Sequence, residues 1–559
     1  SSTTAFNAAS ALASAVTDDR GNTVRYSYNT ATRLQTAVTD AKGNTSQYTY
    51  YSASGMLRLA AITGSNYSTV DYSYDDYGKL TGITRPQTAY SFTYDDWGRT
   101  ISTSVGNRVL STNTYDSFGR LSSVTYGNGY KLSYTYDSID RVESITELEM
   151  PGLSPSKVYE FVYDGEGNLY ELRNYKTHRS TFFEYDHAGR CMASTEKSFT
   201  GSGSSIAYGT TVAAYNYKYD ANNRLAKLTH TLAGYTWSTE YSYDADGRQS
   251  LVKLNNGKTI EYAYGTSTGR PDKITLHLDT DYVVDWTYKS GANGSATSLL
   301  STYANGSDAK YNYDYDANGN ITRIWRGNTS FSDASEKYSY VYDSANQLVR
   351  ENLYYGSGNS SNATITYEYD IWGNLLNKKI YAYTVGTLGT ARETVPYAYT
   401  NSAWKDQLTS YDGESITYDA SGNPTNYLGA TLVWEGQRLK SYTPKDASSG
   451  RANSYVYSYD ENGIRTRKTI GNTVTDYYYN GTLLMGTVKT TTNSDGSTTT
   501  SKLRFSYDAN GKVVAVNYNG NYYYYLRNAQ SDIVKLIDKT GATVVEYAHL
   551  NSDLAAVEV

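Results

Sequence analysis

Cysteine and long apolar runs are scarce in this chain of 559 residues. Cys191 is the only cysteine, so no intramolecular disulfide can form and a disulfide-stapled scaffold is excluded. No apolar run approaches the roughly 18 residues that a membrane-spanning helix needs, and the N-terminal SSTTAFNAAS does not resemble a signal peptide. With 50 Lys and Arg against 56 Asp and Glu, the chain lacks the positive charge of a nucleic-acid binder. We therefore expect no membrane span and no nucleic-acid partner.

Tyrosine is abundant instead, with 64 copies against 9 Phe and 7 Trp. A tyrosine ring is apolar, but its hydroxyl needs a partner or water when it is buried. A thin wall suits such a residue, because the rings stack across neighbouring strands while the hydroxyls reach water. The composition is therefore compatible with an open solenoid, a propeller-like array or a hollow shell, and it does not choose among them.

A Tyr-Asp unit recurs along the chain, at intervals of 20 or 21 residues between Tyr74 and Tyr136. Later copies are spaced more widely, as expected of a repeat with insertions, and such self-similarity indicates a repeat architecture. The residues that we assign to this structural motif are Tyr74, Asp75, Gly78, Tyr94, Asp95, Gly98, Tyr115, Asp116, Gly119, Tyr136, Asp137, Tyr315, Asp316, Gly319, Tyr369, Asp370 and Gly373.

Each unit predicts a β-hairpin. The Asp can accept hydrogen bonds from the backbone ahead of it, the Gly accepts a positive φ, and strand-forming Tyr, Thr, Val and Ile flank the turn. Before the turn the apolar residues alternate, as Leu132 and Tyr134 do. After the turn an apolar pair such as Leu121 and Val124 is three residues apart, which favours a strand with a bulge.

The repeats predict one continuous β domain over residues 1–548, followed by a non-repeat tail over 549–559. The tail segment NSDLAAVEV is the best helix candidate in the chain. Segments rich in Ser, Gly, Thr and Asn predict surface loops between hairpins, at about 196–213, 289–308, 356–363, 443–453 and 490–502.

The repeat resembles the Rhs/YD-repeat family, which includes bacterial Rhs polymorphic toxins, Tc-toxin cocoon components, wall-associated surface proteins and teneurins. VTDDRGNTVRYSYN from Val16 and VTDAKGNTSQYTYY from Val38 are similar to an N-terminal form of the family repeat. LVWEGQRLKSYT from Leu432, DENGIRTRKT from Asp460 and YYYYLRNAQSDIVKLIDKTGATVVEY from Tyr522 resemble late shell segments, as does WKDQLTSYDGESITYDASGNPTNY from Trp404. The resemblance implies tandem YD-repeat hairpins in a continuous spiralling sheet that forms a hollow, all-β shell.

In toxin members of the family, such a shell encloses a C-terminal effector, and a core region after the repeats carries an aspartyl self-cleavage site. This sequence runs through AHLNSDLAAVEV after Tyr547, with neither that core nor a toxin. We therefore expect the chain to be a fragment or a trimmed shell, and the resemblance carries over no catalytic residue.

The sequence contains only weak matches to catalytic and metal-binding motifs. Residues 265–269 fit G-x-S-x-G, but a strand-like run follows where a nucleophile elbow needs a helix. Residues 314–319 match the opening of a calcium loop, but its required glutamate falls on Trp325. A weak cation site stays open there and around Asp244. His187 and Cys191 span a turn, and no histidines have zinc-site spacing. We expect no catalytic, cofactor-binding or metal residue, and no cofactor.

Trp97 and Trp372 stand just before a turn glycine, where an exposed ring could stack on a sugar. The alternative at both positions is packing against the adjacent hairpin. The favoured function is a non-enzymatic shell of a secreted or cell-surface bacterial protein, which encloses a polypeptide cargo or C-terminal toxin absent from this chain. The other hypothesis is a surface adhesin that binds glycans or a partner protein, while an enzyme has little support.

Overall fold

The computed structural model describes residues 2–7, 11–53, 56–64, 68–266, 268–291, 294, 296–307, 310–445 and 454–547. Strands dominate these ranges, and the tail over 549–559 with its helix candidate lies outside the described residues. Nearly every strand pairs antiparallel with the next strand along the chain, which makes the sheet a strip of consecutive hairpins. The pairing lapses between β35 and β36, dividing the strip into a 35-stranded and a 13-stranded sheet. The prediction of an all-β chain is confirmed.

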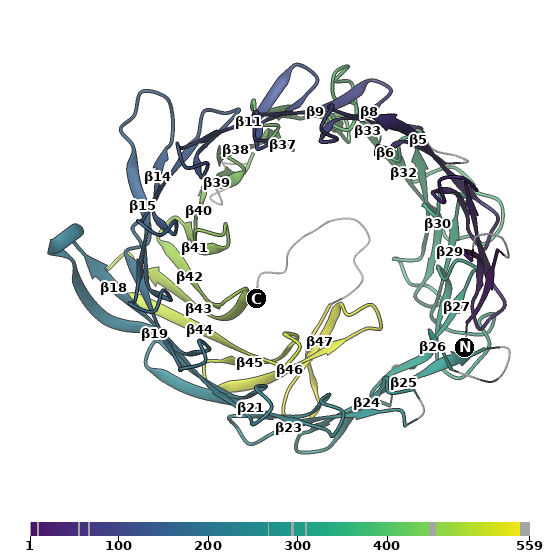
Figure 1. The fold of residues 1–559 in the computed structure, drawn as a ribbon. Helices are drawn as coiled ribbons and strands as arrows, with labels where there is room; N and C mark the ends of the chain where they lie inside the picture. Colours follow the sequence, from purple (N-terminus) through teal and green to yellow (C-terminus); the bar gives the residue numbers. More distant parts are fainter. Residues whose placement is uncertain are drawn as a thin grey trace.

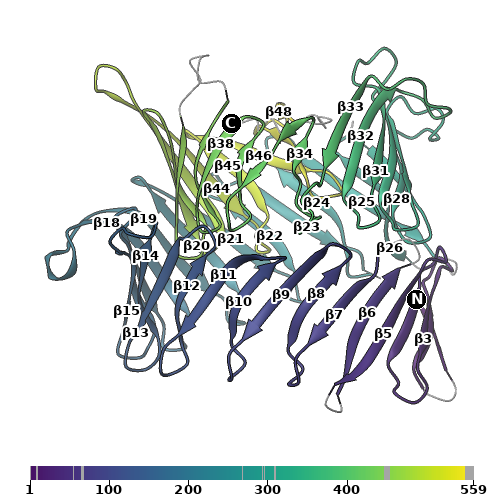
Figure 2. The same ribbon diagram turned by 90° about the horizontal axis from the view of Figure 1, so that it is seen from above.

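The strip winds around a central opening (Figure 1). We call β1 to β25 the first circuit and β26 to β48 the second; Figure 2 shows the first circuit along one rim, with the second above it. The predicted spiralling sheet that forms a shell is thereby confirmed. No helix among the described residues is long and apolar enough to cross a membrane.

The strands of the first circuit, with the 3₁₀ helix η1 (Gly203–Ser205), are β1 (Thr3–Phe6), β2 (Ala13–Thr17), β3 (Thr23–Tyr28), β4 (Gln35–Thr39), β5 (Thr45–Ala53), β6 (Met56–Gly64), β7 (Val70–Tyr74), β8 (Leu80–Arg85), β9 (Thr88–Tyr94), β10 (Thr100–Val105), β11 (Arg108–Tyr115), β12 (Leu121–Tyr126), β13 (Lys131–Tyr136), β14 (Val142–Leu148), β15 (Ser156–Tyr163), β16 (Leu169–Asn174), β17 (Arg179–Tyr185), β18 (Cys191–Thr200), β19 (Ala207–Tyr219), β20 (Leu225–Leu232), β21 (Tyr235–Tyr243), β22 (Gln249–Leu254), β23 (Thr259–Tyr264), β24 (Pro271–His277) and β25 (Tyr282–Ser290).

The strands of the second circuit are β26 (Ala296–Asn305), β27 (Lys310–Tyr315), β28 (Ile321–Arg326), β29 (Lys337–Tyr342), β30 (Leu348–Tyr354), β31 (Ala363–Tyr369), β32 (Leu375–Ala382), β33 (Glu393–Ala398), β34 (Ser410–Tyr411), β35 (Glu414–Ser415), β36 (Thr417–Tyr418), β37 (Pro424–Tyr427), β38 (Ala430–Glu435), β39 (Arg438–Thr443), β40 (Tyr455–Tyr459), β41 (Arg465–Ile470), β42 (Thr473–Asn480), β43 (Leu483–Thr492), β44 (Thr498–Tyr507), β45 (Val513–Tyr518), β46 (Asn521–Arg527), β47 (Ile533–Ile537) and β48 (Thr543–Glu546).

The repeat hairpins carry a bulge where the sequence predicts one. Tyr115 pairs with Leu121, whereas Thr114 pairs with Ser123, so one residue of β12 is extra. The extra residue brings Leu121 and Val124 to the same face although they are three apart. The predicted bulge is confirmed, and the same register shift recurs before the motif tyrosine of β13 and β15.

Three predicted loops are wrong in part. Residues 196–213, 289–308 and 490–502 mostly extend long hairpins, formed by β18 with β19, by β25 with β26 and by β43 with β44. Threonines in these segments, together with the aromatic residues of 196–213, have high strand propensity, and pairing across the hairpin outweighs the effect of their small polar neighbours. Figure 1 shows the β18–β19 hairpin projecting outward from the ring.

The main hydrophobic core lies where the shell is two layers thick. Figure 1 shows β43 to β47 inside the part of the ring that β19 to β24 form. The layers are close: a Cβ added to Gly486 in β43 would lie 2.5 Å from Leu232 Cδ2 in β20. The buried members of this core are Ala213, Tyr215, Leu228, Leu232, Trp237, Tyr241, Val252, Leu254, Ile260, Leu276, Leu278, Val284, Tyr303, Tyr313, Tyr478, Met485, Ala515, Tyr524, Leu526 and Ile537.

Leu254 tests the contribution of this core to stability. Its side chain is buried between the two layers, whereas Leu153 is exposed in a loop of the single-layered wall. Leu254→Ala should lower the free energy of unfolding by about 2–5 kcal/mol, because it leaves a cavity. The matched Leu153→Ala should change it by less than about 0.5 kcal/mol. Urea unfolding of both variants measures the difference, and equal effects would contradict the two-layer core.

Candidate functional site: the wall and its seam

The wall is built from a turn that repeats with nearly constant geometry. In the copy that starts at Asp116, the Oδ1 atom accepts hydrogen bonds from the backbone N–H groups of Phe118 and Arg120, at 3.0 and 2.9 Å. The Arg120 Nε donates to Oδ2 at 2.7 Å. Gly119 has a φ of +87°. We call the turns that start at the motif aspartate YD turns.

The other YD turns use the same contacts. Asp75, Asp95, Asp137, Asp316 and Asp370 each accept N–H groups two and four residues ahead. The glycines at 78, 98, 319 and 373 all have positive φ. In the copy that starts at Asp137, the equivalent position is Asp140, which adopts a φ of +68°.

The carboxylates of several YD turns on the first circuit are held in their charged form. At Asp186, the Arg190 guanidinium and the backbone N–H groups of Arg190 and Ala188 lower the carboxyl pKa. At Asp116, burial acts to raise the pKa, but hydrogen bonds from Arg120 and Phe118 lower it overall. These aspartates are therefore ionised turn acceptors.

Successive hairpins are joined by the motif tyrosine. Tyr136 donates its hydroxyl to the Leu121 carbonyl of the preceding hairpin at 2.8 Å, and the Arg120 guanidinium stacks on its ring at 4.5 Å. We call this pair of contacts the Tyr–Arg clamp. Its hydroxyl bond recurs between the pairs Tyr94–Leu80, Tyr115–Thr100, Tyr163–Val142, Tyr185–Leu169, Tyr219–Cys191, Tyr243–Leu225, Tyr264–Gln249, Tyr342–Ile321, Tyr369–Leu348, Tyr459–Leu439 and Tyr507–Leu484.

Sequence reasoning missed the clamp. It treated the motif tyrosine as an apolar wall residue and the arginine after the glycine as part of the turn. The signal was present, because Lys79, Arg99 and Arg120 each follow a turn glycine, and the second strand after each of them ends in the next motif tyrosine. Recognising this signal requires knowing that the tyrosine contacted by each Arg or Lys lies on the next hairpin.

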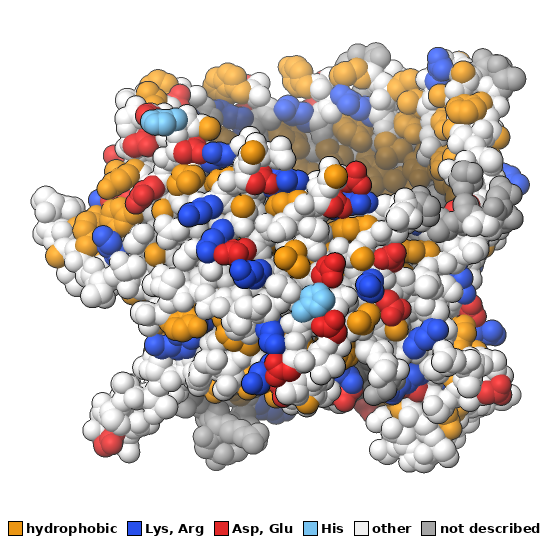
Figure 3. Space-filling model, turned by 90° about the horizontal axis from the view of Figure 1, so that it is seen from below, with side chains coloured by type: hydrophobic (Ala, Val, Ile, Leu, Met, Phe, Trp, Pro, Cys, Tyr) orange, Lys and Arg blue, Asp and Glu red, His pale blue; other side chains and the backbone are white. Residues whose placement is uncertain are grey.

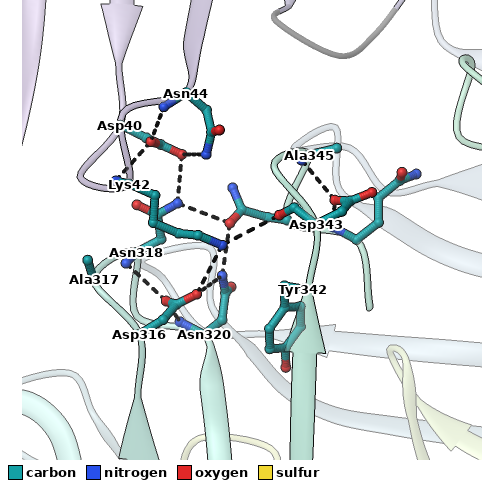
Figure 4. A network of polar contacts seen from close by, with 12 residues as sticks. Asp40, Lys42, Asn44, Asp316, Ala317, Asn318, Asn320, Tyr342, Asp343 and Ala345 are labelled. Atoms are coloured by element: carbon teal, nitrogen blue, oxygen red, sulfur yellow. Dashed lines mark hydrogen bonds and ion pairs between the residues drawn. The ribbon is translucent and has the colours of Figure 1, made fainter. Parts of the chain in front are cut away.

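A second set of contacts seals the two circuits against each other. The connections at the opposite ends of the hairpins, which we call return loops, point from the first circuit to the YD turns of the second. In Figure 4, Asn318 donates to Asp40 Oδ2 at 2.6 Å, while Lys42 Nζ lies 3.4 Å from Asp316 Oδ2. Arg20 donates to the Asp316 carbonyl oxygen at 3.0 Å. We call the contacts between the circuits the seam.

The seam continues around the ring. Asn128, in a return loop, donates through its side chain to Asp419 and to the Gly436 carbonyl oxygen, while its backbone N–H donates to Ser421 Oγ. Lys176 forms ion pairs with Glu147 of its own circuit at 2.6 Å and with Glu435 of the other at 2.8 Å. Further cross-circuit contacts are Ser68–Ile371, Thr88–Lys405, Arg108–Asp419, Tyr159–Tyr459, Arg179–Asp476 and Asn256–Tyr524.

Some acidic residues in the seam have raised pKa values, in contrast to the lowered values of Asp116 and Asp186 on the first circuit. Burial raises the pKa of Asp460, at the start of a YD turn that contacts β15. Burial also raises the pKa of Glu461, to about 7, and that of Asp508. Arg438 donates to the backbone carbonyls of Asp460 and Glu461. Asp460, Glu461 and Asp508 therefore hold their protons more tightly than ordinary carboxyl groups.

The residues that weakly match catalytic and metal-binding motifs lie in turns and wall strands. Residues 265–269 connect β23 with β24, and Ser267 lies outside the described residues. Asp316 accepts a hydrogen bond from the Asn318 N–H of its own turn and forms an ion pair with Lys42.

Single residues with reactive side chains are also accounted for. Burial raises the pKa of the Cys191 thiol, which disfavours the thiolate. Burial lowers the pKa of His230 to about 3, so its ring is neutral. No group of three potential metal ligands occurs among the described residues.

The two tryptophans singled out in the sequence differ in environment. Trp97 is 79% exposed, with the Arg99 guanidinium 4.8 Å from its ring centre. Trp372 is partly buried in a YD turn of the seam.

The fold and its repeated clamp define a β shell built from YD repeats. The family model described as Teneurin YD-shell matches residues 88–174, and the one described as RHS Repeat matches residues 7–45. The resemblance to the Rhs/YD-repeat family is confirmed.

Curated relatives match part of the chain. The tRNA3(Ser)-specific nuclease WapA of Bacillus spizizenii is 28% identical over 279 residues, which cover 44% of this chain and 11% of that protein. The tRNA(Glu)-specific nuclease WapA of Bacillus subtilis subsp. natto is 33% identical over 145 residues, covering 26% and 6%. The chain therefore spans about a tenth or less of the length of these relatives.

Solved structures match almost the whole chain. The crystal structure of TcdB2-TccC3-Cdc42 has a TM-score of 0.64 at 15% identity, covering 97% of this chain and 32% of that one. A Photorhabdus luminescens Tc holotoxin pore has a TM-score of 0.65 at 16% identity, covering 98% and 30%. At this identity the likeness shows the shared fold.

The clamp can be tested at Tyr136. Tyr136→Phe keeps the ring but removes the hydroxyl bond to Leu121, which should cost about 1 kcal/mol. Hydrogen exchange should become faster in β11 to β14 and stay unchanged in distant strands. Tyr77→Phe is the matched control, because Tyr77 is exposed at a turn. Exchange in β11 to β14 that is no faster in Tyr136→Phe than in the control would contradict the clamp.

Glu461 gives the seam a pH dependence. Its folded pKa of about 7 exceeds the ordinary 4.5, so its stabilising contribution is complete below about pH 4.5 and is lost as the pH rises through about 7. The neutral variant Glu461→Gln should therefore increase resistance to urea at about pH 8 and give no advantage at about pH 5. Glu166→Gln, at an exposed YD-turn position, is the control. An equal gain at both pH values would refute the assignment.

Proposed function

We propose that this chain forms part of the wall of a container for a polypeptide and that it acts without catalysing a reaction. The observation that carries the proposal is the seam, which joins two circuits of hairpins around a central opening. A strip of hairpins has unpaired backbone groups only at its two ends. The contacts between its neighbouring circuits therefore decide whether the wall is closed to other molecules. Ion pairs and hydrogen bonds along the seam, such as those of Lys176 and Asn128, support a tight wall.

The interior supports the same proposal. Figure 3 shows the shell hollowed on one side, with hydrophobic side chains on the wall behind the opening. Strands β45 to β47 lie inside the ring in Figure 1, so the strip leads inward toward its last described residues. We infer that the enclosed partner is a C-terminal toxin or another polypeptide, and that the shell serves a secreted or cell-surface bacterial protein. The likeness to Tc-toxin structures and the matches to WapA nucleases support this assignment.

The alternative function, a surface module that binds a glycan or a partner protein, rests on a different part of the wall. It is favoured by exposed apolar side chains on the rim of the first circuit. Those side chains face away from the seam, so both functions are compatible with one molecule.

Protection of an attached polypeptide tests the container. An unstructured segment with a single protease site, attached after Val559, should be cleaved slowly, because the surrounding wall limits the access of the protease. The same segment attached before Ser1 is the matched control, since β1 is exposed throughout, and it should be cleaved rapidly. Lys176→Ala, which removes a cation shared across the seam, should speed cleavage of the C-terminal segment alone. Equal cleavage of both fusions would overturn the proposal.

A further inference from the structure

A buried arginine in the two-layer part of the wall lies without a carboxylate partner. Arg504, in the inner strand β44, is 6% exposed, and no Asp or Glu of the described residues forms an ion pair with it. Its side chain makes one hydrogen bond to a described residue, from Nη1 to Asn517 Oδ1 at 3.4 Å, and its Nε–H is buried without an acceptor. Burial lowers the pKa of this guanidinium, but an arginine keeps its proton at neutral pH. The core therefore holds a positive charge with no negative charge beside it among the described residues.

Other shielded arginines of the shell are paired. Arg179 forms ion pairs with Glu196 at 2.9 Å and with Asp476 at 3.1 Å. Such pairing is what makes a buried charge tolerable, because the water lost on burial has to be replaced by an opposite charge and by hydrogen bonds. The Tyr235 ring centre lies 4.3 Å from the Arg504 guanidinium carbon, which offsets part of the cost, but a tyrosine ring bears no negative charge. Arg504 thus lacks the anion that Arg179 has.

Two more N–H groups without acceptors lie next to Arg504. Asn517 is directly opposite it on β45 and is 2% exposed. The Asn517 Oδ1 accepts hydrogen bonds from Arg504 and from the Gly520 N–H, while its Nδ2 group is buried without an acceptor. From the outer strand β21, Trp237 is 1% exposed, its ring centre lies 6.0 Å from the guanidinium carbon, and its Nε1–H has no acceptor either. All three nitrogen groups are donors only. A positive charge with three unused donors is the chemistry that binds an anion.

The packing around Arg504 limits the size of such an anion. Gly486 lies opposite Arg504 on the other neighbouring strand, β43, and a Cβ added to it would lie 2.5 Å from Leu232 Cδ2 of the outer layer. The Trp237 ring is stacked at 4.8 Å on the ring of His230, which is neutral because burial lowers its pKa to about 3. Layers this close exclude a phosphate or a sugar, whereas a monatomic anion needs little more space than a water molecule. A halide is therefore the class of ligand that fits both the charge and the space.

We propose that Arg504, Asn517 and Trp237 form a binding site for a chloride ion between the two layers of the wall. The N–H groups of Arg504 Nε, Asn517 Nδ2 and Trp237 Nε1 donate to the ion, and its charge balances that of the guanidinium. Because Arg504 and Asn517 belong to the inner layer and Trp237 to the outer one, the ion joins the layers. Chloride thus stabilises the packing of β43 to β47 against β19 to β24. This site is independent of what the shell encloses.

Thermal unfolding of the intact chain in sodium chloride and in sodium gluconate, at equal concentrations, tests the proposal, because gluconate is too large for the site. At about ten times its dissociation constant, chloride should raise the melting temperature by roughly 1–2 °C relative to gluconate, and the rise should saturate. Arg504→Met removes the charge and should abolish the difference between the salts. Asn517→Asp, which keeps the arginine and places a carboxylate beside it, should abolish the difference as well. Crystals soaked in sodium bromide should show an anomalous difference peak beside the Arg504 guanidinium.

Lys489→Met is the matched control, because it removes an exposed positive charge from the neighbouring strand β43. It should keep the full difference between the two salts. The proposal is overturned if the unsubstituted chain melts at the same temperature in both salts, if Asn517→Asp keeps the difference, or if no bromide peak lies beside Arg504. It is also overturned if Lys489→Met loses the difference as completely as Arg504→Met does, since the salts would then act on the surface charge of the whole protein.

Discussion

A hydrogen bond from a tyrosine hydroxyl to the backbone of the preceding hairpin underlies the wall. Over much of the first circuit the sheet is a single layer, so few side chains can be buried deeply, and stability must come from contacts along the strip. The bond from Tyr136 to the Leu121 carbonyl, with Arg120 on the ring, supplies such a contact at each step. Because Phe lacks the hydroxyl, it cannot supply this contact at the motif position.

The seam imposes a different constraint on the same turn. On the first circuit the motif aspartate is near water and paired with Arg in several copies, so keeping it charged costs little free energy. In the seam, Asp460 and Asp508 are buried by the other circuit, and their pKa values rise. Closing the wall therefore costs desolvation of carboxylates, which contacts such as the Lys176 pairs with Glu147 and Glu435 offset elsewhere.

Local features of the fold were predictable because their causes are local. The Asp and Gly of each turn, the alternation before it and the three-residue offset of Leu121 and Val124 specify a bulged hairpin within about 20 residues of sequence. The seam was not predictable, because Asp40 and Asn318 meet only after a full circuit of the shell. The environments of Trp97 and Trp372 could not be distinguished for the same reason: their motif positions are alike, and the circuit decides which one is covered.

The contrast between the two circuits indicates how one repeat can serve two purposes. The motif aspartate needs only the backbone N–H of the third residue of a YD turn, as in the hydrogen bond from Phe118 to Asp116. That position is therefore free to vary without harm to the hairpin. Small or polar residues there, such as Ser421, allow the circuits to approach, whereas Trp97 and Phe118 keep the opposite rim open to solvent. The hairpin fixes the spacing of these side chains, and the single variable position decides whether an edge is sealed or left available for binding.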